Sequence, residues 1–448
     1  MATAPCSPRA HHHYPPEVIP IMATFQPVRG TRDFYPEDMR LRNWLFDIWR
    51  ETSRQFGFEE YDSCVLESEE LYIRKAGDEI TGQLYSFEDK GGRRIALRPE
   101  MTPSLARLIL QRQKSLTYPL KWFTIPQCFR YERMTRGRKR EHYQWNLDVV
   151  GQPDLVAEVE VISALLTSLE KTGLNASHVE LRVNDRQILN ALLRGLGIPE
   201  DRHTPVMVVI DKREKVAPEV LNDLLAEEGL DKKQVGRLND FFAAAETGFS
   251  EAAGLLEDEG EATQGLLRLL DMLEMVGLRD YLTIDCTVVR GLSYYTGTVF
   301  ELRDRAGKFR SICGGGRYDS LLSTYGGDSI PAIGFGFGDV VILELLEELK
   351  LLPALTHDID YAVLPFSEDQ VAVALDVAQR LRSAGLRVAS DFSFRKLKRA
   401  LQRADEMGAR KAVLLLPDEL AKGEVVVRDM AARSELRLAK EAFLADPS

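Results

Sequence analysis

The sequence predicts an α+β fold, in which an antiparallel sheet flanked by helices carries a helical insertion and is followed by a small α/β domain. Two extended segments, 121–132 and 142–151, flank a short loop and are expected to pair as antiparallel strands. Residues 181–280 change to acid-rich, helix-favouring runs, after which strand patterns return. Beyond residue 352, strand and helix patterns alternate at a spacing typical of a separate α/β domain.

Composition excludes several classes of protein. The chain has 448 residues, of which 44% are hydrophobic and 28% charged, a balance that excludes disordered and fibrous proteins. Its net charge of −11 means that a nucleic acid would have to be bound by local basic patches. No apolar run reaches the roughly 18 residues of a membrane helix, so we expect no membrane partner. The five scattered cysteines form no C-x-x-C pair, which indicates a reducing, cytoplasmic location and no zinc site.

The first part of the core is expected over residues 23–180, after an N-terminal extension of residues 1–22 that we expect to be disordered. Apolar spacing, glycines and turn residues define its elements. In chain order they are a helix over 37–56, strands over 84–88 and 94–97, a helix over 103–113, the two extended segments, and a helix over 154–171 with Asp154 as its N-cap.

The insertion is expected to span 181–280, and the core to resume over 281–352. The second part of the core is predicted to contain strands over 281–289 and 294–302, a glycine cluster at 314–316, and alternating glycines that lead into a helix ending near Leu349. The C-terminal domain, 357–448, is predicted from three strands, 361–364, 386–389 and 411–416, and from two helices, 367–383 and 394–407.

Polar and apolar residues alternate along segment 142–151. Alternation places Gln144, Asn146 and Asp148 on one face of the strand, while aromatic and aliphatic residues lie on the other face. A solvated sheet face is one interpretation of the polar row. The aromatic residues on both extended segments favour a covered sheet, where unpaired charges are costly and usually need a ligand. We therefore favour a binding site on this face.

Several motifs together resemble one enzyme family. Phe129-Arg130-Tyr131-Glu132-Arg133, the basic loop after it and the strand ending at Gly151 resemble motif 2 of class II aminoacyl-tRNA synthetases. Segments 289–296 and 314–319 resemble two signatures of the histidyl-tRNA synthetase family, and segments 97–102 and 29–33 fit the same family. The resemblance extends from Phe25 to the C-terminus, in the family's order. It implies a class II synthetase catalytic core, a helical insertion and a C-terminal α/β anticodon-binding domain.

The resemblance also implies a ligase that joins L-histidine to tRNA(His) through a histidyl-adenylate intermediate. The implied substrates and partners are ATP with Mg²⁺, L-histidine, tRNA(His) and a second copy of the chain in a homodimer. Joining a carboxylate to the α-phosphate of ATP brings two anions together, so positioned cations matter more than a base. Arg130 and Arg290 are the implied catalytic residues.

The resemblance assigns two sets of binding residues. The implied ATP-binding residues are Arg130, Glu132, Arg138, His142, Gly315 and Arg317. The implied histidine-binding residues are Glu100, Thr102, Arg130, Gln144, Asp148, Arg290, Tyr294 and Tyr295. A neutral imidazole offers one N–H and one lone pair, which a carboxylate and a phenol hydroxyl can satisfy together. Because such a pocket can reject wrong amino acids by about 10⁴-fold, we expect that the insertion is no editing domain.

Two basic clusters are expected to contact tRNA. Residues Arg133, Arg136, Lys139 and Arg140 belong to the loop between the two extended segments, and Arg395, Lys396, Lys398 and Arg399 belong to the C-terminal domain. A solvated charged loop is the alternative for the first cluster. If the clusters contact tRNA, binding should weaken as salt rises.

The sequence departs from the family pattern at two positions. In the resemblance, Val341 occupies the position of the arginine that usually ends motif 3 and binds the γ-phosphate. Three explanations are open: another cation such as Arg138 or Arg317 replaces the arginine, ATP is bound less tightly, or the alignment slips there. Cys64 occupies the position of a proline in motif 1. Two alternatives therefore remain: a non-catalytic paralogue resembling the regulatory subunit of ATP phosphoribosyltransferase, or another class II synthetase.

Overall fold

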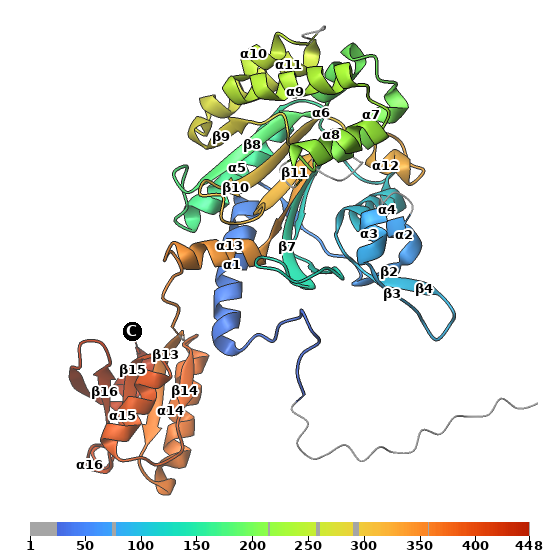
Figure 1. Cartoon of the computed structure of the whole chain (residues 1–448). Helices are drawn as coiled ribbons and strands as arrows, with labels where there is room; N and C mark the ends of the chain where they lie inside the picture. Colours follow the sequence, from blue (N-terminus) through green and yellow to red (C-terminus); the bar gives the residue numbers. More distant parts are fainter. Residues whose placement is uncertain are drawn as a thin grey trace, which may run out of the picture. The chain divides into compact units, whose positions relative to one another are not determined.

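The computed structural model describes residues 25–73, 78–213, 216–256, 260–289, 295–356 and 358–447. The chain divides into two compact units, one ending at Leu352 and one beginning at Pro353 (Figure 1). The predicted N-terminal extension, residues 1–22, lies outside the described residues, which begin at Phe25.

A mixed, mostly antiparallel sheet of nine strands forms the centre of the described first unit. Its strand order is β1-β5-β7-β12-β11-β10-β8-β9, with β6 paired to β7. The strands β1/β5 and β8/β9 are parallel pairs at the two ends of the sheet. The bounds are β1 Glu59–Glu60, β5 Leu120–Thr124, β6 Gln127–Phe129, β7 Glu141–Val150, β8 Val179–Asp185, β9 Leu282–Ile284, β10 Thr298–Asp304, β11 Cys313–Arg317 and β12 Ala332–Gly338.

Helices α1 (Pro36–Gln55) and α5 (Val156–Lys171) cover one face of this sheet. Trp145 of β7 stacks on Trp49 of α1 with ring centroids 5.9 Å apart, and its indole N–H donates to Ser53 Oγ over 3.0 Å. Leu147 and Val149 are buried in the same apolar cluster. Each such burial contributes about 1.5–3 kcal/mol, which fixes the face that β7 turns to the core. The predicted alternation along this strand is thus confirmed.

A small three-stranded sheet and short helices lie beside the central sheet. The sheet has the order β2-β4-β3, with β2 at Leu66–Ser68, β3 at Tyr85–Glu88 and β4 at Arg94–Leu97. The accompanying helices are α2 (Glu69–Ile73), α3 (Asp78–Gln83), α4 (Thr102–Arg112) and α12 (Leu321–Thr324). Helix α13 (Asp339–Glu348) instead packs on the central sheet, where Ile342 and Leu346 belong to the main apolar cluster. Buried Arg98 joins this region to the central sheet, because its guanidinium binds Asp62 and the carbonyl of Gln127 over 2.8 and 3.0 Å.

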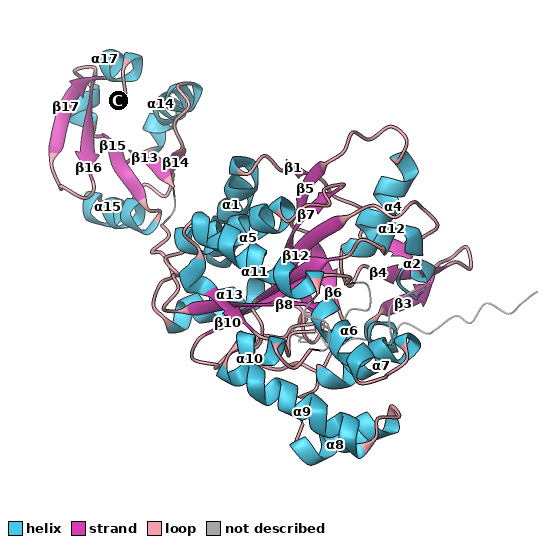
Figure 2. Cartoon of the chain, turned by 90° about the horizontal axis from the view of Figure 1, so that it is seen from above, coloured by secondary structure: helices cyan, strands magenta, loops and turns pink. Residues whose placement is uncertain are grey.

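The insertion is helical, as predicted, but it begins later. Residues 181–185 belong to β8, which pairs along its whole length with β10. Val179, Leu181 and Val183 alternate into the core, a pattern too short to stand out in the sequence. The insertion helices are α6 (Arg186–Gly195), α7 (Glu200–Ile210), α8 (Pro218–Glu227), α9 (Lys232–Thr247), α10 (Phe249–Ala253) and α11 (Glu261–Met275). Figure 2 shows α7 to α10 gathered at one end of the first unit.

The second unit is a five-stranded sheet of order β14-β13-β15-β16-β17 with apolar clusters on both faces. The predicted strands and helices are present as β13 (Ile359–Pro365), β14 (Val388–Ser390), β15 (Ala409–Leu415), α14 (Val371–Ser383) and α15 (Leu397–Glu406). The structure adds the antiparallel strands β16 (Glu424–Asp429) and β17 (Glu435–Ala439), the short helix α16 (Pro417–Leu420) and the helix α17 (Lys440–Ala445).

Two local predictions are wrong. Helix α5 begins at Val156, and its N-cap residue is Leu155 rather than Asp154. The strand expected over 281–289 is reduced to β9, because a 3₁₀ turn over Arg279–Tyr281 precedes it and a turn follows at Asp285. Among the described residues, no helix is both long and apolar enough to cross a membrane.

Candidate active site

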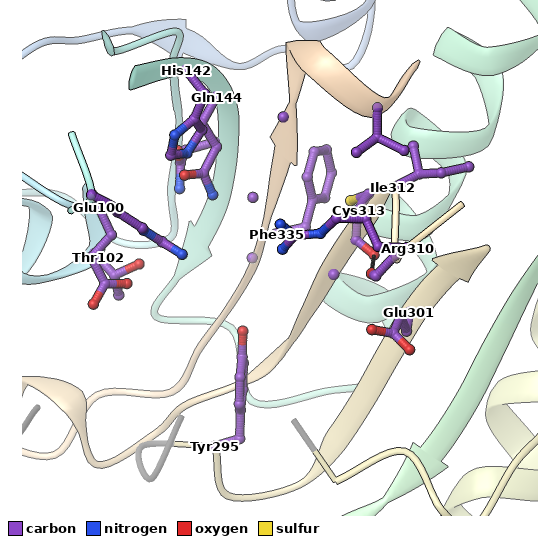
Figure 3. A pocket seen from close by; sticks show the side chains of 18 of the residues that line it. Glu100, Thr102, His142, Gln144, Tyr295, Glu301, Arg310, Ile312, Cys313 and Phe335 are labelled. Atoms are coloured by element: carbon purple, nitrogen blue, oxygen red, sulfur yellow. Dashed lines mark hydrogen bonds between the residues drawn. The ribbon is translucent and has the colours of Figure 1, made fainter. Parts of the chain in front are cut away.

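A cavity of about 590 Å³ opens on the face of β7 opposite α1 and α5. Its walls come from widely separated parts of the first unit: the start of α4, the segment after β6, the strands β7 and β10 to β12, and the end of α7. Figure 3 shows Glu100, Thr102, His142 and Gln144 on one side of the cavity, with Glu301, Arg310 and Cys313 on the other.

The polar row of β7 lies in this cavity, as its alternation predicts. Gln144, Asn146 and Asp148 all line it. Glycines of β12 stand opposite them, with Gly334 beside Asp148 and Gly336 beside Asn146. A Cβ on Gly334 would collide with the Asp148 carboxylate and lie 2.7 Å from the carbonyl of Leu147. The glycines of β12 therefore provide the room in which the polar side chains of β7 lie.

Asp148 is a buried carboxylate of the cavity, with 3% of its surface exposed. Burial raises its pKa to about 7, and a hydrogen bond donated by the Tyr318 hydroxyl opposes this shift. The ring of Tyr295 packs edge-on against Tyr318, with centroids 6.4 Å apart. The structure thus brings the predicted pair Asp148 and Tyr295 to one end of the cavity. Tyr318 was not predicted, although the segment 314–319 that contains it was.

Glu100 and Thr102 are two further polar residues of the cavity. Glu100 is buried, and Thr102 is the first residue of α4. Both line the cavity together with Gln144. A carboxylate, a hydroxyl and an amide oxygen are acceptors suited to a protonated amino group, so these three side chains can hold such a group in the cavity.

Arg130 and Glu132 also line the cavity, from the segment that follows β6. The Nε of Arg130 donates to the carbonyl of Pro99 over 2.9 Å, which fixes the side chain while leaving the other guanidinium nitrogens for a ligand. Glu132 forms an ion pair with Arg138, with 2.6 Å between Oε2 and Nε. A ligand amino group that binds Glu132 must therefore share this carboxylate with Arg138.

His142 lines the cavity next to Gln144 (Figure 3). Burial lowers the pKa of its imidazole to about 3, with the charge of Arg130 as a further cause, while a hydrogen bond with Gln144 acts in the opposite direction. The ring is therefore neutral at physiological pH. A neutral ring has the flat, weakly solvated face that stacking on a nucleotide base requires.

Arg317, a predicted ATP contact, is bound to another residue outside the cavity. Its guanidinium binds Glu158 of α5 through two nitrogens, at 2.5 and 2.6 Å, and also donates to the carbonyl of Gln152 over 3.3 Å. Neither Arg317 nor Gly315 is among the residues that line the cavity. A Cβ on Gly315 would lie 2.6 Å from the Phe300 ring, so this glycine allows close strand packing, and its neighbour Gly314 lines the cavity instead.

The four side chains of the basic loop that are predicted to contact tRNA have different partners and exposure. Arg136 binds Glu348 of α13 over 2.6 Å and lies over the ring of Phe309. Arg140 stacks on Tyr131, Lys139 lines the cavity and Arg133 is exposed. The loop is thus bound to α13 through Arg136. In the second unit, the expected residues Arg395, Lys396, Lys398 and Arg399 are all exposed.

Two expected residues, Arg290 and Tyr294, lie outside the described residues. Other lining residues were missed by the sequence analysis, namely Asp211 and Arg213 from the insertion and Glu301, Arg303 and Arg310 from β10 and the loop after it. Only the tertiary fold brings the insertion to the cavity, so no local pattern could have indicated it. Within the described residues, no group of three or more His, Cys, Asp or Glu could hold a metal ion. A Mg²⁺ ion that arrives with ATP needs only one or two protein carboxylates.

The chain resembles known proteins along most of its length. The profile of the family described as histidyl-tRNA synthetase matches residues 30–338, and that of the anticodon binding domain matches residues 360–445. A histidine–tRNA ligase of Arabidopsis thaliana, described as chloroplastic/mitochondrial, is 47% identical over 412 residues, 92% of this chain and 84% of the relative. The solved histidyl-tRNA synthetase of Nostoc sp. PCC 7120 has a TM-score of 0.77 at 25% identity and covers 95% of this chain and 99% of its own. A protein of Bacillus halodurans C, described as an ATP phosphoribosyltransferase regulatory subunit/histidyl-tRNA synthetase, has a TM-score of 0.71 at 26% identity, over 86% of this chain and 97% of that one.

Proposed function

Because the chain belongs to the histidyl-tRNA synthetase family, we propose that it is a histidine–tRNA ligase that joins L-histidine to tRNA(His) through histidyl-adenylate. One observation carries the proposal: a single cavity holds both a buried carboxylate with two phenols and an arginine-bearing wall. The first set suits an imidazole, and the second suits the phosphates of ATP.

Recognition of histidine follows from hydrogen-bond pairing at Asp148. The ionised carboxylate accepts the N–H of a neutral imidazole, and the hydroxyl of Tyr295 donates to the lone pair of the other ring nitrogen. Tyr318 holds the Asp148 carboxylate in place through its own hydrogen bond. Glu100, Thr102 and Gln144 bind the α-amino group. An apolar amino acid would leave these buried groups unpaired, which is the basis of its rejection.

Activation requires that the histidine carboxylate attack the α-phosphate of ATP, with pyrophosphate leaving. Negative charge builds on the phosphate oxygens as the two anions meet, and a fixed cation at that point lowers the barrier. We assign this role to Arg130, and its hydrogen bond to the Pro99 carbonyl, which fixes the direction of the guanidinium, supports the assignment. Arg290 is the proposed second cation. The Mg²⁺ that accompanies ATP supplies further charge neutralisation.

The adenosine end of ATP is proposed to lie at the segment after β6. Glu132 accepts from the adenine amino group, and His142 stacks on the base. Support for the stacking role comes from the lowered pKa of His142, since a charged imidazolium would be more strongly solvated.

Transfer to tRNA is proposed to use both basic clusters. The loop over 133–140 would touch the acceptor end near the cavity, and the start of α15 would touch the anticodon stem. The match of residues 360–445 to an anticodon binding domain supports the second contact. We further propose a homodimer, as an expectation from the family. A reducing compartment such as the cytoplasm is proposed because Cys64, Cys128, Cys286 and Cys313 are free thiols.

The test is pyrophosphate exchange into ATP, assayed with each amino acid in turn. The proposal requires exchange that depends on histidine alone. Dependence on another amino acid would make the chain a different class II synthetase. The absence of exchange with every amino acid would favour the regulatory paralogue, for which Val341 is the supporting observation.

A further inference from the structure

Arg310 reaches the cavity from the loop that joins β10 to β11. It lines the cavity together with its neighbours Phe309 and Ile312. Figure 3 shows it on the wall that also carries Glu301 and Cys313, across from Glu100 and Thr102. The residues resembling known motifs do not include it.

Three segments meet around this arginine. A Cβ added to Gly137 of the basic loop would lie 3.1 Å from Val341 Cγ2 and 3.6 Å from the Cγ and Cδ atoms of Arg310. The backbone of Gly137 also donates to Glu344 of α13 over 3.2 Å, so the basic loop is tied to α13 at this point. The stem of Arg310 therefore lies beside Val341, in the first turn of α13, with the basic loop against both.

The ring of Phe309 helps to hold this position. The guanidinium of Arg136 lies over it at 4.4 Å, and Arg136 is in turn bound to Glu348. Ile312, on the other side of Arg310, is 3% exposed. Because both neighbours are anchored, the loop presents Arg310 from a fixed backbone, which is what a preorganised phosphate contact requires.

The charge of Arg310 bears on the proposed nucleotide end of the cavity more than on the proposed amino-acid end. Its charge, with those of Arg130 and Arg32, contributes to the lowered pKa of His142. The causes of the raised pKa of Asp148, by contrast, are burial and the Tyr318 hydrogen bond, with no arginine among them. The charges of Arg130 and Arg310 thus act on His142, the proposed base-stacking residue, and are not among the causes of the Asp148 shift.

We propose that Arg310 binds the β- and γ-phosphates of ATP, and so supplies the cation that is missing at Val341. The inference rests on the proposed function, since it assigns one more residue to the same nucleotide site. Of the two replacements expected from the sequence, Arg317 is bound to Glu158 outside the cavity and Arg138 is paired with Glu132 at the proposed adenine contact. A guanidinium can bind two phosphate oxygens at once, which a lysine ammonium cannot do in the same planar geometry.

The test compares the binding of ATP with that of AMP, measured by calorimetry on the full chain. AMP has only the α-phosphate, so loss of a β,γ-phosphate contact weakens ATP binding and leaves AMP binding unchanged. We expect Arg310→Ala and Arg310→Met to bind ATP about ten- to a hundredfold more weakly than the wild type, in line with hydrogen bonds to charged groups. Arg310→Met keeps the aliphatic stem and guards against a packing defect.

Lys308→Ala is the matched control. Lys308 lies in the same loop, is bound to Glu348 at the surface and does not line the cavity. It should bind both nucleotides as the wild type does. The double variant Arg310→Ala/Val341→Arg, which returns a guanidinium to the same corner, should recover part of the lost ATP affinity.

The possible results separate the two proposals. Equal ATP binding by Arg310→Met and the wild type would overturn the role of Arg310, as would an equal loss of ATP and AMP binding in both variants. If the wild type shows no histidine-dependent pyrophosphate exchange, the proposed function fails, whereas the ATP and AMP measurements still decide whether Arg310 contacts the distal phosphates.

Discussion

Asp148 shows how one residue connects burial to recognition. A carboxylate at 3% exposure is costly to ionise, and its pKa of about 7 reflects that cost. The Tyr318 hydroxyl lowers the cost by donating to the carboxylate. The arrangement leaves Asp148 close to its titration point near neutral pH, so small changes around it should alter histidine binding measurably.

The first prediction concerns Tyr318→Phe. Only ionised Asp148 can accept the imidazole N–H, so kcat/KM for histidine should fall as pH drops below about 7. Tyr318→Phe removes the bond that lowers the pKa of Asp148. The acid limb should therefore move to higher pH, and KM for histidine at pH 7 should rise about tenfold or more. Pyrophosphate exchange measured over about three pH units, from about 5.5 to about 8.5, checks both effects.

Tyr281→Phe is the control for this prediction, because Tyr281 also donates to a carboxylate, that of Glu170, but lies outside the cavity lining. Free histidine titrates in the same pH range in every assay, so the difference between variants is the informative quantity. An acid limb that is the same in Tyr318→Phe and the wild type would contradict the assigned role.

At this scale the sequence was informative where a local pattern set the geometry. Alternation along 142–151 was enough to place Asp148 and Gln144 on the ligand face. The direction of Arg317 could not be predicted, because it depends on the buried Glu158, which belongs to a helix far away in the sequence.

Strand β12 is the element on which the shape of the cavity depends. Its glycines face the polar row of β7, and they differ in how much space a methyl group would find. Gly334 has the Asp148 carboxylate and the Leu147 carbonyl within reach of a Cβ, whereas the nearest atom to a Cβ on Gly338 is His142 Cδ2 at 4.0 Å.

Gly334→Ala is therefore predicted to displace Asp148 and to reduce kcat/KM for histidine about a hundredfold, the cost of misplacing a site by about 1 Å. Gly338→Ala, on the same strand, should cause a much smaller loss. Steady-state exchange kinetics on both variants, with circular dichroism to confirm folding, provide the comparison. Similar losses in the two variants would show that the strand, rather than the space beside Asp148, limits activity.

The pair Arg317–Glu158 joins strand β11 to helix α5. Its side chains are 10% and 0% exposed. Arg317→Ala would leave Glu158 buried without its partner, so we predict that the free energy of unfolding falls by about 3–5 kcal/mol. Affinity for ATP should stay near that of the wild type, since Arg317 does not line the cavity.

Urea denaturation and ATP titration test these two expectations together. Arg380→Ala is the control, because its pair with Glu441 is exposed and should contribute less than about 1 kcal/mol. A stable Arg317→Ala variant that binds ATP weakly would restore the sequence-based assignment of Arg317 to the nucleotide.

At the scale of the whole molecule, the cavity and the exposed basic residues proposed to contact tRNA belong to different units. All residues that line the cavity belong to the unit that ends at Leu352, and the exposed basic residues at the start of α15 belong to the other. Strand and helix alternation was sufficient to predict the second unit, but not β16 and β17, which form its antiparallel edge. The approach of α7 to the cavity was also beyond prediction, since it follows from how the insertion packs on the core.

A chain that ends at Leu352 is predicted to keep histidine-dependent pyrophosphate exchange and to lose most charging of tRNA(His). The reason is that the proposed adenylate site belongs to the first unit, whereas the proposed anticodon contacts belong to the second. Exchange and aminoacylation assays on the same preparation measure the two activities. In the full chain, charging at low tRNA concentration should weaken as salt rises, as expected for contacts to phosphates. Parallel loss of both activities on truncation would contradict this division.

The most direct test of the account is a crystal structure of the chain with a non-hydrolysable histidyl-adenylate analogue. The account predicts the imidazole between Asp148 and Tyr295, with Tyr318 behind the carboxylate, and the phosphate within hydrogen-bonding distance of Arg130. An analogue bound with its imidazole away from Asp148, or with its phosphate beyond the reach of Arg130, would contradict it.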